Sequence, residues 1–385
     1  MTSFSFHTTP HILFEAGGTT KIADLVRTFG AQHVMLVTDA GVRGAGLTAH
    51  AENALAQAGI RVTVFDQVKA DPPSHIIEDA AQMARAGGVD AVVSIGGGSA
   101  LDTAKLVAYL GKSNDRLEDI YGVEQAKGSR LPLLLAPTTA GTGSEVTPIS
   151  IVTTPTQEKK GVVSSCLLPD WAILDPELTL KLPAPVTAAT GIDAMVHAIE
   201  AYTSRHKKNP MSDQLAIRAL ALLSSNIRAV CQNGADLEAR SHMLLGSMLA
   251  GMAFANAPVA AVHALAYPIG ALFHVPHGLS NALVLTQVLQ FNLPAAQALY
   301  AELAPVILPG KSFASRDVAA RSFVAELEAL SRDCGVPRSL RDVGISESDL
   351  DRLAEDAMKQ TRLLVNNPRE LTLSDARGIY ADALG

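Results

Sequence analysis

Short apolar runs alternate with amphipathic segments along the first half of the chain. The apolar runs predict buried β-strands, and the segments between them carry apolar residues at helical spacing. We expect strands at 11–18, 33–38, 61–65, 90–95, 131–136, 149–153 and 161–165, and helices at 20–29, 47–58, 76–86 and 100–110. Strands that alternate with helices are typical of a parallel, doubly wound sheet, in which ligands bind beyond the carboxyl ends of the strands.

The pattern changes after the Leu-Pro-Ala-Pro sequence at 182–185, and helical spacing of apolar residues dominates from there on. Helices are expected at 187–204, 212–231, 235–255, 260–273 and 281–291, with several more between 314 and 384. The sequence therefore predicts an α/β domain with a parallel, Rossmann-like sheet over 1–182 and an all-helical domain over 183–385.

Composition narrows the class of protein. The chain has 385 residues, of which 48% are hydrophobic and 18% charged, so it can bury a large core. The net charge of -7 and the lack of a basic block argue against nucleic acid and against acidic membrane surfaces as partners. The first ten residues do not have the pattern of a secretory signal, and the three cysteines are widely spaced. A protein of the reducing cytoplasm is expected.

No Asp, Glu, Lys or Arg occurs between Arg240 and Glu302. By length alone this stretch could cross a bilayer, so a membrane protein is an alternative. The stretch contains several His, Asn and Pro residues, however, and it lacks flanking basic residues and aromatic belts. Buried helices of a large bundle explain it better.

Four potential metal ligands lie in this second half. Asp193 and His197 are four residues apart, so on a helix they lie on one face. His263 and His277 follow within the charge-free stretch, where a histidine needs a polar partner. Taken alone, a histidine such as His263 could be a hydrogen-bonded core residue. Asp193 and His197 could likewise be an ordinary pair on a helix surface. Together the four residues form a ligand set that suits iron or zinc better than calcium.

A glycine-rich turn lies at the end of the predicted strand 90–95. Gly97, Gly98 and Ser99 precede the predicted helix, where glycines and free backbone N–H groups can accept a pyrophosphate. Asp102 can stabilise the helix start or order the loop. Asp39, which ends an earlier strand, can accept hydrogen bonds from a ribose and would repel a 2′-phosphate, which favours NAD over NADP. A structural tight turn at each place is the alternative.

The segment 137–147 is rich in hydroxyl groups and glycines. Such a loop can bind phosphate, ribose or carboxamide groups, although it could equally be a solvated connection. Its candidates for binding a cofactor are Thr138, Thr139, Thr142 and Thr147. Lys160, in the turn between the next two predicted strands, can reach a phosphate or a ribose, or can simply be solvated.

Four motifs together resemble the iron-containing (group III) alcohol dehydrogenase family. They are Gly-Gly-Gly-Ser-Ala-Leu-Asp at 96–102, Pro-Thr-Thr-Ala-Gly-Thr-Gly-Ser-Glu at 137–145, Ala-Thr-Gly-Ile-Asp-Ala-Met-Val-His-Ala-Ile-Glu at 189–200, and the segment from His263 to Pro-His-Gly at 276–278. The resemblance extends over essentially the whole chain. It implies a nucleotide domain and a helical domain with the active site between them, and a homodimer. It implies a divalent metal, with Fe²⁺ preferred and Zn²⁺ as the alternative, bound by Asp193, His197, His263 and His277. It also implies NAD bound by Asp39, Gly98, Ser99, Thr138, Thr139, Thr147, Lys160 and Leu178.

The chain departs from the family pattern at two positions. Many members have a histidine four residues after the third ligand, where this chain has Tyr267, and many have Asn where this chain has Asp71. Proton relay through Tyr267 and a cofactor contact at Asp71 are therefore open. His274 is a second candidate for the proton path, and it could also be structural.

The predicted activity is hydride transfer between a small alcohol, or its aldehyde or ketone, and NAD(H). The metal would polarise the substrate oxygen and lower the pKa of the alcohol. Apolar residues around Phe254 and Leu272 suggest a small hydrophobic pocket, but no feature names the substrate. Alternatives are a lyase that resembles dehydroquinate synthase, for which the helical half lacks a basic cluster, and a non-catalytic metal- or nucleotide-binding protein.

Overall fold

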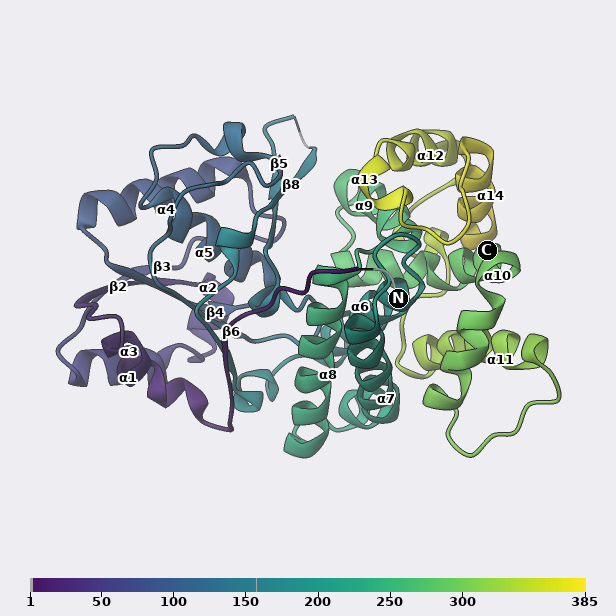
Figure 1. Cartoon of the computed structure of the whole chain (residues 1–385), viewed down its shortest axis with the longest axis horizontal. Helices are drawn as coiled ribbons and strands as arrows, with labels where there is room; N and C mark the ends of the chain where they lie inside the picture. The colour runs from purple at the N-terminus through teal and green to yellow at the C-terminus, as the bar shows by residue number, and fades with distance from the viewer. Residues whose placement is uncertain (1–2, 157) are drawn as a thin grey trace. The chain divides into compact units, whose positions relative to one another are not determined.

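A computed structural model describes residues 3–156 and 158–385 of the chain. Their contacts form two compact units, His7–Lys181 and Leu182–Gly385, and residues 3–6 group with the second unit. All strands of the described chain lie in the first unit, and the second is helical (Figure 1). The predicted combination of an α/β domain and an all-helical domain is confirmed.

The first unit is built on a six-stranded, wholly parallel sheet. In spatial order its strands are β1 (His11–Phe14), β9 (Trp171–Leu174), β6 (Leu133–Pro137), β4 (Ala91–Gly96), β2 (His33–Val37) and β3 (Arg61–Phe65). The central strands β6, β4 and β2 are buried along their whole length, which explains why their sequences are continuous apolar runs.

Helices cover both faces of this sheet. On one face, α1 (Ile22–Arg27) and α3 (Ala49–Gln57) pack on alternate residues of β2 and β4, including Leu36 and Val93. On the other face, α4 (Ser74–Gly87) and α5 (Gly98–Leu110) pack on the intervening residues, including Met35 and Val92. Successive residues of a strand point to opposite faces, so each buried strand contributes to both halves of the core.

A second, three-stranded sheet lies in the same unit, in the order β5 (Gly122–Val123), β8 (Lys159–Val163) and β7 (Ile149–Thr153). β7 and β8 form an antiparallel hairpin, and β5 pairs with β8 in parallel. Val152 and Val162 pack this sheet against Leu106 of α5. The hairpin is therefore packed on α5.

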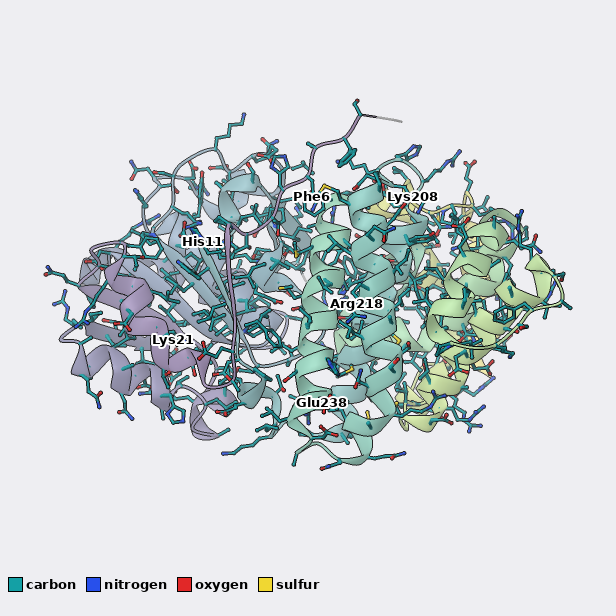
Figure 2. The ribbon with its side chains drawn as sticks, turned by 60° about the horizontal axis from the view of Figure 1, so that its bottom comes forward. Phe6, His11, Lys21, Lys208, Arg218 and Glu238 are labelled. Atoms are coloured by element: carbon teal, nitrogen blue, oxygen red, sulfur yellow. The ribbon has the colours of Figure 1, made fainter. Side chains whose placement is uncertain are left out.

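The second unit consists of helices. The principal ones are α6 (Ala184–Thr203), α7 (Pro210–Gln232), α8 (Leu237–Asn256), α9 (Ala261–Phe273), α10 (His277–Ile307), α11 (Arg316–Asp333), α12 (Leu350–Met358), α13 (Thr361–Leu364) and α14 (Leu373–Leu384). Figure 2 shows charged side chains such as Arg218 and Glu238 on the exposed faces of α7 and α8. No helix of the described chain has by itself the length and apolar character of a membrane span. Only α8 and α9 taken together do, and they are bent by 106°.

α10 is much longer than the predicted helix at 281–291. It begins at His277 and continues through Pro294 and Pro305, although a proline removes one backbone hydrogen bond. Pro294 and Gln290, the residue one turn before it, are both exposed, so water can bind the carbonyl oxygen that the proline leaves unpaired. The predicted helix ended before Pro294, whereas the observed helix continues through this proline.

Candidate metal centre and nucleotide site

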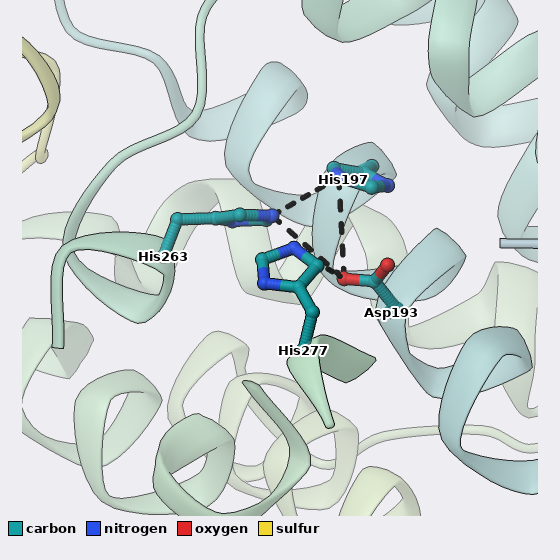
Figure 3. Close-up of side chains that lie close together, drawn as sticks. All are labelled: Asp193, His197, His263 and His277. Carbon is teal, nitrogen blue, oxygen red and sulfur yellow. Dashed lines mark hydrogen bonds and ion pairs between the residues drawn. The ribbon is translucent and has the colours of Figure 1, made fainter. Parts of the chain in front are cut away.

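α6 supplies the first two side chains of the predicted metal centre. Asp193 and His197 lie one turn apart and are only 1% and 4% exposed. α6 is buried along most of its length from Thr187 onward, so its inward face can carry a carboxylate and an imidazole only if they have partners. Figure 3 shows both side chains pointing toward the same point as the other two predicted ligands.

The other two ligands come from α9 and from the start of α10. His263 lies in the first turn of α9, and His277 is the first residue of α10. Gly278 lets α10 begin directly against α6, because a Cβ atom there would lie 2.5 Å from the carbonyl oxygen of Ala189. The glycine of the Pro-His-Gly motif thus brings His277 up to Asp193.

The four ligand atoms fit one cation. Asp193 Oδ1 lies 4.0 Å from His197 Nε2 and 3.7 Å from the Nε2 atoms of both His263 and His277. His197 Nε2 and His263 Nε2 are 3.0 Å apart, and all four atoms lie within 4.8 Å of one another. Ligand atoms about 2.1 Å from a shared ion lie about 3.4 Å apart in a tetrahedron and about 4.2 Å apart when opposite. The donor set therefore needs only small adjustments to bind a first-row divalent metal.

The ionisation state of Asp193 favours the binding of a cation. Burial by itself would raise the pKa of Asp193, but the three imidazoles and a hydrogen bond from Asn281 Nδ2 outweigh burial and lower it. Asp193 therefore presents a carboxylate to the site. His197 is held by stacking on Phe254, with ring centroids 4.3 Å apart, and by stacking on His263 at 4.7 Å.

Two polar side chains that were not predicted contact the ligands. Asn281 donates to Asp193 Oδ1 at 2.6 Å, and a carboxylate oxygen of Glu200 lies 2.7 Å from His263 Nδ1. Both are buried. A signal for them was present in the sequence, because Asn281 lies four residues after His277 and Glu200 lies three after His197, on the same helical faces as those ligands.

The two candidates for the proton path differ in position. Tyr267 lies one turn after His263 on α9 and is half-buried, and its ring centroid is 5.9 Å from that of His277. His274 is exposed and ends α9 in a left-handed conformation with φ of 57°. Tyr267 is therefore beside the metal centre, whereas His274 has the position of a helix cap.

The predicted nucleotide residues follow three neighbouring strands of the large sheet. Asp39 follows β2, the glycine-rich turn follows β4, and Thr138 and Thr139 follow β6. The chain leaves β2 for β3 on one side and returns to β4 on the other, which makes the gap between β2 and β4 the switch point of the sheet. Ligands of doubly wound sheets bind at such points.

Close packing explains two of the glycines. A Cβ atom on Gly96 would lie 2.5 Å from the Cβ atom of Ala100, and one on Gly98 would lie 2.7 Å from Thr142 Cγ2. Gly97 has more room, since its nearest neighbour there would be Thr139 at 3.6 Å. The turn is therefore pressed against the threonine loop, and backbone N–H groups at the start of α5 lie beside threonine hydroxyls.

Asp102 and a buried lysine join α5 to this loop. Asp102 accepts hydrogen bonds from Ser144 Oγ at 2.6 Å and from the backbone N–H of Ile151 at 2.9 Å. Lys105 Nζ donates to Ser144 Oγ at 2.8 Å and to Thr147 Oγ1 at 3.2 Å. Burial lowers the pKa of Lys105, an effect that Asp102 partly opposes. Of the two roles considered for Asp102, ordering the loop is the one that these contacts support.

Comparison with known proteins assigns the chain to a family. The model for iron-containing alcohol dehydrogenases matches residues 9–176, and the model for the C-terminal part of the Fe-containing alcohol dehydrogenase family matches residues 187–384. Long-chain-alcohol dehydrogenase 1 of Geobacillus thermodenitrificans is 42% identical over 370 residues, which are 95% of this chain and 93% of that protein. The chain belongs to the iron-containing alcohol dehydrogenase family.

Other relatives agree with this assignment over the full length. The NAD-dependent methanol dehydrogenase of Bacillus methanolicus is 32% identical over 381 residues, which are 99% of this chain and 100% of that one. A crystal structure of a 1,3-propanediol oxidoreductase matches with a TM-score of 0.96 at 34% identity and covers 100% of both chains. The predicted class of enzyme, a metal-dependent alcohol dehydrogenase, is therefore confirmed.

Lys160 and Leu178, which the family pattern suggested for the cofactor, and Asp71, whose cofactor contact was left open, each contact other parts of the first unit. Lys160 is exposed, and its Nζ lies 3.9 Å from a carboxylate oxygen of Glu158. Leu178 is 5% exposed and packs in the core beneath the sheet. Asp71, at the position where Asn is common, accepts from Lys159 Nζ at 2.7 Å. Their contacts with a cofactor stay predictions.

Proposed function

We propose that this alcohol dehydrogenase interconverts small alcohols and the corresponding aldehydes or ketones, with NAD(H) as the coenzyme. The observation that carries the proposal is the convergence of Asp193 and three imidazoles on one point, in a chain whose other unit offers a glycine-rich turn at a sheet switch point. Relatives named as methanol and 1,3-propanediol dehydrogenases support small alcohols as the substrate class.

The metal is proposed to be Fe²⁺, with Zn²⁺ as the alternative, because mixed carboxylate and imidazole ligands accept both ions. A divalent ion at this site would supply a Lewis acid that lowers the pKa of the substrate alcohol. Asp193, His197, His263 and His277 would hold it. Elemental analysis of the purified protein, followed by reconstitution of the apoprotein with each ion, distinguishes the two.

The chain's own residues are proposed to orient the alcohol and to carry its proton away. Phe254, which stacks on His197, presents an aromatic face beside the centre and favours an apolar carbon chain. Tyr267 is the better placed of the two candidates for the proton path, because it lies next to His277. A Tyr267→Phe variant is then expected to lose activity more at low pH than at high pH, where the solvent itself accepts the proton more readily.

NAD is proposed to bind in the first unit, with its pyrophosphate at Gly97, Gly98 and Ser99 and its adenosine ribose at Asp39. Asp39 also caps the short helix α2 (Ala40–Gly44) by accepting from the N–H of Val42 at 2.9 Å. Its charge and its cap can therefore be separated by mutation. NAD held by these residues would supply the acceptor for the hydride of the alcohol.

A single set of measurements tests the proposed function. Metal content and NAD-dependent oxidation of straight-chain alcohols are measured for the wild type and for His263→Ala. We expect the variant to lose both, because an imidazole that bridges the ligand set and Glu200 is removed. A variant that keeps its metal and its activity would exclude His263 as a ligand, and a metal-loaded wild type that oxidises none of the alcohols would refute the proposed substrate class.

The family pattern also leads us to propose a homodimer in the cytoplasm. The three cysteines of the chain are free thiols, which agrees with a reducing compartment. Analytical ultracentrifugation of the metal-loaded protein tests the dimer, and cell fractionation tests the compartment.

A further inference from the structure

We propose that Glu200 is a positioning residue of the metal centre, which fixes the tautomer of His263 and supplies the second buried negative charge that a divalent cation needs. Glu200 is 3% exposed and belongs to α6, the helix that also carries Asp193 and His197. One of its oxygens lies 2.7 Å from His263 Nδ1. It is not itself one of the four converging ligand groups.

Both oxygens of the Glu200 carboxylate face N–H groups. Its Oε2 atom accepts from the backbone N–H of Ala260 at 2.9 Å as well as facing His263 Nδ1, and its Oε1 atom accepts from the N–H of Val262 at 2.7 Å. Because an ionised carboxylate only accepts hydrogen bonds, the hydrogen of this contact must sit on His263 Nδ1. The lone pair of the imidazole is therefore left on Nε2, the atom that faces the other ligands.

The same contacts tie the ligand to the start of its own helix. α9 has no side-chain cap from its N-cap residue Ala260, and the first N–H groups of a helix lack partners within it. Glu200 accepts one such N–H from Val262, and a carboxylate at this positive end of a helix is favourable. α9 and the imidazole of His263 are thus held in register with α6, which carries the other two buried ligands.

Charge balance gives Glu200 a second role. Asp193 and Glu200 together carry two negative charges, and three neutral imidazoles add none, so a divalent ion brings the buried cluster to zero. Isolated charges are costly in such surroundings. With glutamine at position 200 the loaded centre would keep one uncompensated positive charge, even if the geometry were unchanged.

The affinity of the apoprotein for Zn²⁺ tests the role, because it does not depend on turnover or on the proposed substrate. We expect Glu200→Gln to raise the dissociation constant, measured by competition with a chromophoric chelator, by about 10- to 100-fold. Glu302→Gln is the matched control, since Glu302 accepts from Tyr202 Oη at 2.7 Å in the same unit and is not one of the ligand groups. It should bind Zn²⁺ as the wild type does.

Two further measurements separate positioning from a merely structural role. The melting temperature of both apo variants reports on folding alone, and a lower melting temperature with an unchanged zinc dissociation constant would overturn the proposal. Nitrogen-15 NMR of the zinc-loaded wild type decides the matter even if Glu200→Gln fails to fold. We expect His263 to show a protonated Nδ1 and a metal-bound Nε2, and the opposite assignment would overturn the proposal.

Discussion

Gly278→Ala is expected to damage the metal centre without replacing any of the four ligands. The new Cβ atom would lie 2.5 Å from the carbonyl oxygen of Ala189 and 3.3 Å from the Cβ atom of Asp193. A carbon–oxygen contact is normally about 3.3 Å or longer, so the start of α10 must move away from α6 by about 0.8 Å. Ligand distances tolerate only about 0.2 Å, so His277 is carried out of range of an ion held by α6.

The size of the effect follows from this displacement. Overpacking typically costs about 1–3 kcal/mol of unfolding free energy, and a displaced ligand lowers metal affinity by at least about tenfold. Chelator competition with Zn²⁺ and thermal unfolding of the apoprotein measure the two effects separately. Gly378→Ala in α14 is the control, because no atom lies within 4 Å of its added Cβ and alanine favours a helix by about 1 kcal/mol.

The control should be neutral or slightly stabilising and should bind Zn²⁺ normally. If Gly278→Ala bound Zn²⁺ with the affinity of the wild type, the close approach of α10 and α6 would not position His277, and the reasoning above would be wrong.

Three other changes test the first unit. Asp39→Asn keeps the cap of α2 and removes the charge, so it should raise activity with NADP relative to NAD as much as Asp39→Gly does; an unchanged coenzyme ratio in both would exclude the charge as the cause. Lys105→Met should lower unfolding free energy by about 3 kcal/mol and weaken NAD binding in calorimetry, because it breaks a buried hydrogen-bonded cluster. Burial raises the pKa of Glu145 from 4.5 to about 7, so the folded state binds its proton more tightly and stability falls as pH rises from 4.5 to 7. Glu145→Gln should abolish this fall, worth about 3 kcal/mol, in denaturant unfolding at pH 5 and 8.

Apolar runs located most strands of the large sheet, because strands covered on both faces must be apolar throughout. Two less buried strands, Arg61–Phe65 at the edge of the large sheet and Ile149–Thr153 in the small sheet, also begin and end where they were predicted. Strand β9, Trp171–Leu174, was not predicted. Its four residues stand directly before the Asp-Pro turn at which the sequence pattern changes, so they were assigned to the end of the first domain. Strand order could not be predicted, because it depends on the crossovers and leaves no local pattern.

Spacing alone could pair Asp193 with His197, since both lie on one helix. It could not bring His263 and His277 to them, because that depends on how α9 and α10 pack on α6. Their residue types suggested the complete ligand set, and the resemblance to the family implied the same four ligands. Lys105 was missed for a similar reason, since a lysine in the middle of a helix is usually solvated, and only the loop and hairpin that cover α5 make this one buried.

The charge-free stretch between Arg240 and Glu302 follows from the electrostatics of the centre. It supplies α9 and most of α8 and α10, and therefore two of the four ligands and the aromatic ring beside them. Both acids of the cluster come from α6 instead, so their number is fixed at two. A further lysine or arginine close by would repel the cation, and a further acid would exceed its charge in surroundings where an unbalanced charge is costly. The helices that resembled membrane spans by composition thus surround the centre with uncharged side chains. In these surroundings the charges of two carboxylates and one divalent ion sum to zero.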